Sequence, residues 1–289
     1  MTQRLARHVP RSPSMTPVRP RSMLFTLYGD YAYPRRTDVP LRGLVEVGQA
    51  LGLSEVAVRS AVARLAREGW IVACRDVVGA RYGLSDTGRH LIEEGTRRIY
   101  KPRSGRWDGT WCVLNYSIPE SQRSGRDRIR KQLAWLGLGP MGGGAYVSPR
   151  DVRDELLEML RRHRLHAYAR VFASRLAGPC TDAELVAQCW DLRSIARSYE
   201  AFVAFYEPQF RRDRALRARR ALADVDAFVT RFALTHDFRR FPFMDPDLPA
   251  ELLPRGWSGA KARRLFEAHH AMLTGGAVRF FEKIAGRDA

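Results

Sequence analysis

The side chains best suited to recognition chemistry lie on one face of a helix that the sequence predicts from Ser54 to Glu68. Ser54 is a good N-cap, and Gly69 accepts the left-handed conformation that ends helices. A buried stripe recurs at i, i+3, i+4 and i+7: Val58, Ala61, Val62 and Leu65. The opposite face has small residues ringed by long cationic ones: Val56, Ser60, Ala63 and Arg67, flanked by Arg59 and Arg64. Such a face can approach another surface closely while its arginines reach out, and the major groove of DNA is one such surface.

Arginines on an exposed helix face usually form only a solvated surface, so the neighbouring segments decide between the two interpretations. Residues 22–100 are predicted to form three helices, a hairpin of two strands around Gly79, and a last helix. This order is the winged helix-turn-helix plan, in which the third helix enters the major groove and the hairpin reaches phosphates or the minor groove. We therefore predict base contacts from Val56, Arg59, Ser60 and Arg64, and phosphate or wing-groove contacts from Arg67, Arg75 and Arg81.

The charge of the chain agrees with a polyanionic partner. The 289 residues include 49 Lys and Arg against 31 Asp and Glu, a formal net charge of +18. The excess is spread along the chain, although residues 1–21 hold five Arg and no acidic residue and are predicted to be a disordered basic arm. No apolar run reaches the roughly 18 residues that cross a bilayer, and the N-terminus lacks the apolar core of a secretory signal, so we expect no membrane partner.

The cysteine pattern and the absence of catalytic motifs argue against metal or nucleophile chemistry. The four cysteines show no CxxC spacing, and no nearby His completes a zinc-site pattern, so we expect reduced thiols in a cytoplasmic protein. The sequence contains no GxSxG, HExxH or P-loop motif. We therefore expect no catalytic residue, no metal and no cofactor, and a protein that is not an enzyme.

The remainder of the chain predicts two further segments, which together with the first give an α+β protein. Residues 106–178 alternate strand, helix, strand, helix and strand, an order that favours a ferredoxin-like domain, with GPMGGGAY (139–146) expected to be a turn. Residues 179–289 are almost wholly helical by pattern and rich in aromatic residues. The expected organisation is a basic arm (1–21), a winged helix-turn-helix (22–102), a ferredoxin-like domain (106–178) and a helical effector or dimerisation domain (179–289).

Several stretches, taken in this order, resemble the PaaX family of bacterial repressors of phenylacetate catabolism and their relatives. They are SMLFTLYGDY, AVRSAVARLAREGW, WDGTWCVLNYSIPESQRSGRDRIRKQLAWLGLG, AYVSPRD and HDFRRFPFMDPDLPAELLPRGW. The resemblance implies a homodimer on an imperfect palindromic operator of double-stranded DNA, released by an aryl-acyl-CoA such as phenylacetyl-CoA. An effector of this kind needs an apolar slot and cations, and we name His236, Arg239 and Arg240 as candidate ligand-binding residues.

Two other functions stay open at this level. The central segment also looks like CRISPR-adaptation ferredoxin-fold proteins, which have been described as metal-dependent nucleases with an Asp near the end of the first strand. Here Ser117 takes that place, and a hydroxyl is a poor Mg²⁺ ligand. The alternative is an RNA-binding protein that uses arginine-rich surfaces such as Arg211–Arg220, a run that could also hold coenzyme A phosphates or be only a solvated helix face.

Overall fold

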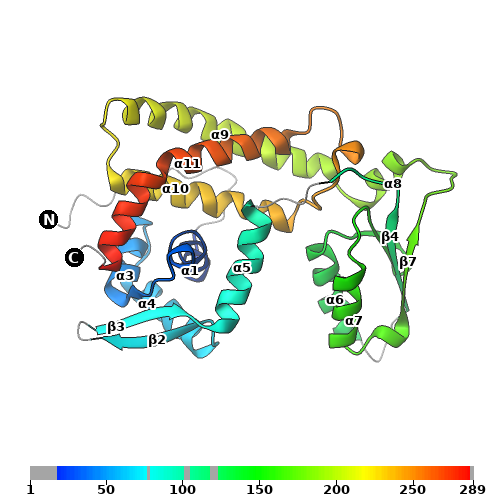
Figure 1. Ribbon diagram of the computed structural model, residues 1–289, viewed down its shortest axis with the longest axis horizontal. Helices are drawn as coiled ribbons and strands as arrows, with labels where there is room; N and C mark the ends of the chain where they lie inside the picture. Colours follow the sequence, from blue (N-terminus) through cyan, green and yellow to red (C-terminus); the bar gives the residue numbers. More distant parts are fainter. Residues whose placement is uncertain (1–17, 77–78, 101–104, 118–122, 287–289) are drawn as a thin grey trace. The chain divides into compact units, whose positions relative to one another are not determined.

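The computed structural model describes residues 18–76, 79–100, 105–117 and 123–286 in two compact units (Figure 1). Unit 1 consists of Met1–Lys101, Ser198–Arg239 and Gly259–Ala289, and unit 2 of Pro102–Arg197 and Arg240–Ser258. Two antiparallel sheets are combined with many helices, which confirms the predicted α+β class. Most of the predicted basic arm, positions 1–17, lies outside the described residues. The segment 179–289, expected to be one domain, contributes to both units.

Unit 1 combines an N-terminal and a C-terminal set of elements. The first set is α1 (Pro20–Leu27), the π-helical turn η1 (Tyr28–Ala32), α2 (Tyr33–Arg35), β1 (Val39–Pro40), α3 (Leu41–Ala50), α4 (Glu55–Arg67), β2 (Ile71–Asp76), β3 (Gly79–Leu84) and α5 (Asp86–Tyr100). The second set is most of α9 (Leu192–Ala218), with α10 (Asp224–Phe238) and α11 (Ser258–Ala285). The three strands form an antiparallel sheet in the order β1-β3-β2.

Local signals account for α4 as the sequence predicts. Ser54 caps the helix, and its Oγ accepts a hydrogen bond from the Ala57 amide at 3.3 Å. Gly69 follows the helix with a φ of 76°, which a residue with a Cβ adopts only at a cost. The predicted apolar stripe is buried: Val58, Ala61, Val62 and Leu65.

A single hydrophobic core joins the two sets of elements in unit 1. It contains Met23 and Leu44 from the N-terminal set, and Phe228 and Phe281 from the C-terminal set. Figure 1 shows α10 and α11 beside α1 and α3. The approach of α3 to α11 requires a glycine, because a Cβ on Gly43 would lie 2.7 Å from atoms of Ile284. The segment predicted to be an independent DNA-binding domain therefore completes its core with residues from the C-terminal third of the chain.

One buried carboxylate ties four elements of unit 1 together. Asp30, in η1, is 6% exposed. Its Oδ1 accepts hydrogen bonds from Tyr100 of α5 at 2.8 Å and His270 of α11 at 3.0 Å. Its Oδ2 accepts one from Thr235 of α10 at 3.1 Å and lies 3.1 Å from Nη1 of Arg231, also in α10. Burial alone raises the pKa of Asp30, but the hydrogen bond from His270 and the charge of Arg231 outweigh it and bring the pKa below its usual value.

His269, which precedes His270 in α11, makes a second buried contact between a histidine and an aspartate. His269 Nε2 lies 3.0 Å from Oδ2 of Asp213 in α9, and both side chains are almost fully buried. Adjacent helical residues point in different directions, so His269 and His270 hold α11 to α9 and to η1 respectively.

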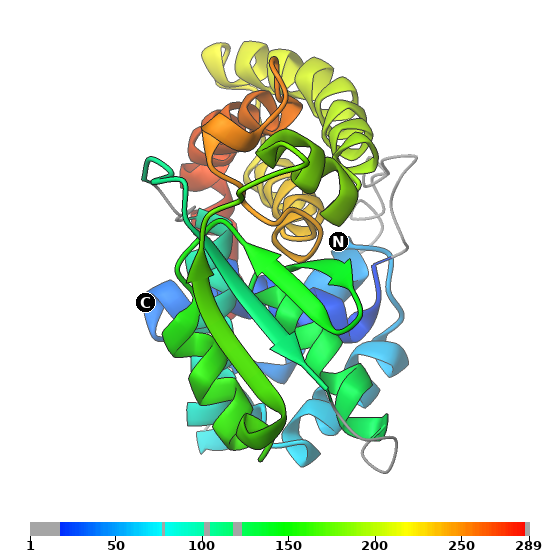
Figure 2. The same cartoon turned by 90° about the vertical axis from the view of Figure 1, so that its right-hand side faces the viewer.

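Unit 2 is a four-stranded antiparallel sheet with helices on one face (Figure 2). Its elements are β4 (Trp111–Tyr116), α6 (Arg123–Trp135), β5 (Gly139–Gly142), β6 (Ala145–Ser148), α7 (Arg153–Arg162), η3 (His166–Tyr168), β7 (Ala169–Ser174), α8 (Asp182–Cys189), η4 (Phe241–Phe243) and η5 (Ala250–Leu252). The strand order is β5-β6-β4-β7. Leu114 of β4 packs with Leu133 of α6 and Leu156 of α7 in the core beneath the sheet.

The expectation that GPMGGG is only a turn was wrong. Gly139–Gly142 pairs with β6 as the edge strand β5, so the order is β-α-β-β-α-β rather than β-α-β-α-β. Glycine gives no strand signal, because it lacks the side chain whose alternation marks a strand. The absence of a side chain at Gly139 lets Trp190 pack closely, because a Cβ there would lie 2.6 Å from the Trp190 ring.

We expect Asp30→Asn to lower the free energy of unfolding by about 3–5 kcal/mol, because it leaves Arg231 buried without its counter-ion. The pKa of Asp30 is lower in the folded chain, so its contribution is present near neutral pH and is lost as the pH falls below about 5 toward that pKa. Urea unfolding from pH 3 to 7 measures both effects. Glu46→Gln, a change of an exposed carboxylate on α3, is the control. A wild-type-like Asp30→Asn curve at neutral pH would contradict the assignment.

Candidate nucleic-acid interface

The predicted recognition face of α4 is open to solvent. Val56, in its first turn, is 78% exposed, although valine side chains are usually buried. The rest of the predicted face is also exposed: Arg59, Ser60, Ala63, Arg64 and Arg67. Figure 1 shows α4 beside the β2–β3 hairpin within unit 1. The structure thus brings the helix and the hairpin together as the sequence predicts.

The arginines of this face differ in their partners. Arg59 Nε donates to Oε1 of Glu55 at 2.7 Å, and both side chains are about half exposed. The guanidinium groups of Arg64 and Arg67 have no ion pair or hydrogen bond within the described part of the chain. A single helix face therefore carries one arginine held by an ion pair and two arginines that have no partner among the described residues.

The C-terminal end of α4 is held against α1. Glu68 accepts from Nη1 of Arg21 and, at 3.1 Å, from the indole Nε1–H of Trp70. Trp70 in turn packs edge-on against Phe25 of α1, with ring centroids 6.0 Å apart. These contacts fix the helix at the end opposite Ser54.

The two hairpin arginines occupy different situations. Arg75 pairs with Ala80 near the tip, and its side chain lies outside the described residues. Arg81 is half-buried, and its Nη2 donates to the main-chain oxygen of Asp38 at 2.7 Å and of Ala285 at 2.8 Å. In the structure, Arg81 fastens the hairpin to the end of α11, and its predicted phosphate or groove contact stays a prediction.

The three candidate ligand-binding residues lie on both sides of the boundary between the units. His236 and Arg239 belong to unit 1, whereas Arg240 belongs to unit 2. His236 is buried, with Nδ1 2.8 Å from the hydroxyl of Thr26. Arg239 donates to the main-chain and side-chain oxygens of Ser22, and its Nε has no partner within the described residues. Burial lowers the pKa of Arg239 to about 10.

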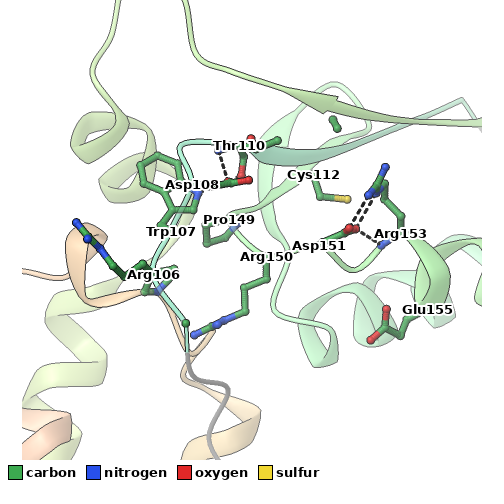
Figure 3. A pocket seen from close by; sticks show the side chains of 13 residues that line it. Arg106, Trp107, Asp108, Thr110, Cys112, Pro149, Arg150, Asp151, Arg153 and Glu155 are labelled. Atoms are coloured by element: carbon green, nitrogen blue, oxygen red, sulfur yellow. Dashed lines mark hydrogen bonds and ion pairs between the residues drawn. The ribbon is translucent and has the colours of Figure 1, made fainter.

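Unit 2 contains a cavity of about 470 Å³ between the start of β4 and the segment before α7 (Figure 3). Trp107 and the buried thiol of Cys112 contribute apolar surface. Its cations already have partners: Arg153 binds both oxygens of Asp151, which brings the pKa of that carboxyl to about 2, and Arg150 donates to Asp247. A third, Arg106, lies 3.8 Å from Glu251. The charges lining this cavity are balanced, so it shows no preference for an anion.

Nothing in the described residues assembles a metal site. No group of three His, Cys, Asp or Glu side chains lies together there. Ser117 is exposed just after β4, where the nuclease hypothesis needs a carboxylate. All four cysteines are free thiols. None of the described helices combines the length and apolar character needed to span a bilayer.

An exposed helix with unpaired arginines beside an antiparallel hairpin is typical of nucleic-acid-binding proteins. Three family descriptions match the chain: "PaaX-like protein" over residues 19–88, "PaaX protein central Cas2-like domain" over 104–186, and "PaaX-like protein C-terminal domain" over 190–283. The chain belongs to the PaaX-like family.

Two proteins show the similarity of this chain to others. The transcriptional repressor PaaX of Escherichia coli (strain K12) is 31% identical over 255 residues, which cover 86% of this chain and 78% of that protein. The uncharacterized protein Rv0674 from Mycobacterium tuberculosis has a solved structure that superposes with a TM-score of 0.60, covering 92% of this chain and 99% of that one. At 22% identity, this second similarity shows a shared fold alone.

Sequence reasoning did not find the partners of two interface residues. The contact of Arg81 with Ala285 joins residues 204 positions apart, and no local pattern signals such a bond. The pair of Glu55 and Arg59 was within reach, because their i, i+4 spacing is the usual spacing of a helical ion pair.

We expect Arg81→Ala to destabilise the fold by about 1–3 kcal/mol, because two main-chain acceptors lose a charged donor. Chemical denaturation measures this loss. Arg89→Ala, which removes an exposed arginine of α5, is the matched control. If Arg81→Ala had wild-type stability but weaker DNA binding, the side chain would contact DNA rather than fasten the hairpin.

Proposed function

We propose that this protein is a transcriptional repressor that binds operator DNA through α4 and the β2–β3 hairpin, used as a winged helix-turn-helix. The observation that carries the proposal is the exposed face of α4, in which small residues are flanked by arginines. Arg59 is paired with Glu55, and Arg64 and Arg67 have no acidic partner among the described residues. Family membership and the E. coli relative named as a transcriptional repressor support it. Such a face fits the major groove, where small side chains permit close approach and arginines bind guanine or phosphate.

The roles of individual residues follow from their positions on the helix. The N-terminal residues of a recognition helix contact base edges, which assigns base contacts to Val56, Arg59, Ser60 and Arg64. Val56 suits the methyl group of a thymine, because it is apolar and almost fully exposed. Arg67 at the end of α4 and Arg75 near the hairpin tip are assigned to phosphates.

We assign unit 2 a scaffolding and dimerisation role. Its order β-α-β-β-α-β with the sheet order β5-β6-β4-β7 supports a ferredoxin-like domain. A homodimer suits an imperfect palindrome, because a two-fold axis in the protein matches one in the operator.

The effector that we propose is an aryl-acyl-CoA, phenylacetyl-CoA above all, and the regulated genes those of aromatic-acid catabolism. The support is the resemblance to the PaaX family. Of the three candidate ligand residues, Arg239 offers the clearest chemical support, since its half-buried guanidinium has no carboxylate partner within the described residues. Buried charges are normally paired, so an anionic group is a suitable partner for it.

We expect Arg59→Ala to weaken operator binding by about 1–3 kcal/mol and to relax the base preference at one position, if the contact is bidentate. Footprinting and equilibrium titration measure both effects. Arg217→Ala, an equal loss of charge from an exposed position on α9, is the control and should leave the base preference unchanged.

Arg75→Ala completes this experiment, because a phosphate contact behaves differently. It should weaken all duplexes about equally and reduce the slope of log K against log salt by about one. An Arg59→Ala protein with wild-type operator affinity would contradict the assignment of α4 as the recognition helix.

We expect phenylacetyl-CoA to release the operator, with little effect from free phenylacetate or free coenzyme A. A hundredfold loss of DNA affinity requires the ligand to favour the DNA-incompetent state by about 2.7 kcal/mol. A DNA-release titration with these three compounds and other acyl-CoAs measures it, and Arg239→Gln should raise the thioester concentration needed. If no thioester shifts DNA binding at saturation, the effector assignment fails while the DNA-binding assignment stands.

A further inference from the structure

The ion pair between Glu55 and Arg59 occupies one edge of the guanidinium. Nε donates to Glu55 Oε1 at 2.7 Å. A guanidinium can bind a two-acceptor partner along its Nε–Nη edge or along the edge formed by the two Nη atoms. Within the described part of the chain, neither Nη atom of Arg59 has a partner. The ion pair therefore leaves the edge formed by Nη1 and Nη2 of Arg59 open, and it restricts the orientation of the Arg59 side chain.

In the proposed binding mode, the Glu55–Arg59 pair lies in the part of α4 that contacts the edges of the bases. Glu55 is the first residue of α4, and Arg59 lies one turn further on the same side. Val56 between them is 78% exposed, so the described residues leave this part of the helix open. An open arginine edge matches O6 and N7 of guanine, which form two parallel hydrogen bonds with it in the major groove.

A carboxylate at this place needs compensation, because DNA phosphates repel it. Glu55 has two sources of compensation in the protein: the guanidinium of Arg59 and the positive N-terminal end of α4. A third is available in the groove, where cytosine presents an N4 amino group that Asp and Glu accept from. Glu55 can interact with Arg59, the helix N-terminus and a cytosine amino group at the same time only when a G·C pair lies opposite the start of the helix.

The geometry points to Glu55 as a specificity-determining residue of the operator contact. Glu55 orients Arg59 so that Nη1 and Nη2 bind O6 and N7 of one guanine, and its second oxygen, Oε2, accepts from the N4 amino group of a cytosine in the same or the adjoining base pair. This inference rests on the proposed function. Arg64 and Arg67 lack an acidic partner in the described residues and supply cationic attraction without this constraint.

The test compares full-length wild type with Glu55→Gln and Glu55→Ala in selection from a random duplex library, followed by titration of the selected duplex. The Arg59→Ala protein identifies the guanine that Arg59 reads, because its preference disappears at that position. Both Glu55 variants should lower the preference for this guanine about fivefold or more, while binding to unselected duplex stays equal or becomes tighter. Replacing the guanine with 7-deazaguanine, which lacks N7, should weaken wild type about tenfold and the Glu55 variants less.

Glu93→Gln is the matched control, since it removes one exposed carboxylate from α5 and changes the net charge equally. It should keep the wild-type preference for guanine. The Ser54 cap is unchanged in every variant, so we expect α4 to be retained, and circular dichroism checks that the total helix content is that of wild type. A Glu55→Gln protein that selects the same guanine as strongly as wild type overturns this inference alone. A wild-type protein that selects no sequence overturns the proposed function as well.

Discussion

A carboxylate buried in the helical turn after α1 is the interaction on which unit 1 depends. Removing Asp30 from water is costly unless several donors and a cation converge on it. Those partners come from α5, α10 and α11, so these helices can pack against η1 only in the arrangement that brings Tyr100, Arg231 and His270 to one point. Apolar contacts alone are nondirectional and tolerate several packings, whereas this cluster accepts one. Since α1 carries η1 and packs on α4, the placement of the exposed helix face follows from a polar contact deep in the unit.

How much the sequence can predict depends on the range of each interaction. The start, end, buried stripe and exposed face of α4 follow from Ser54, Gly69 and a 3.6-residue period, all of them local. The strand β5 escaped prediction because its glycines carry no alternation, and it is stabilised by pairing with β6. Asp30 and His270 are 240 positions apart, so no window of sequence displays their contact. The candidate ligand residues are adjacent in sequence, yet the unit boundary falls between Arg239 and Arg240, which a pattern of Arg and Phe cannot reveal.

The arrangement of α11 bears on how an effector could act in this unit. His269 is hydrogen-bonded to Asp213 of α9, and His270 to Asp30 of η1. The helix α11 therefore contacts both α9, which carries the run Arg211–Arg220, and the turn that follows α1. The contacts are buried and hydrogen-bonded, and such contacts have discrete alternatives rather than a continuous range. A ligand changes DNA affinity only through a difference in its affinity for two such arrangements. The packed route from α9 through α11 to η1 is a physical connection along which that difference can be expressed.

The close fit of α11 against Gly43 has a consequence for the life of the protein in the cell. A ribosome delivers the chain from its N-terminus, so α3 and α4 emerge long before Phe281 and Ile284, which complete the core around them. Until the last turn of α11 leaves the exit tunnel, those early helices lack an apolar surface that they need for stable packing. The core that supports the exposed face of α4 is therefore complete only after α11 has been synthesised. We expect premature termination within α11 to yield an incompletely packed polypeptide that is degraded.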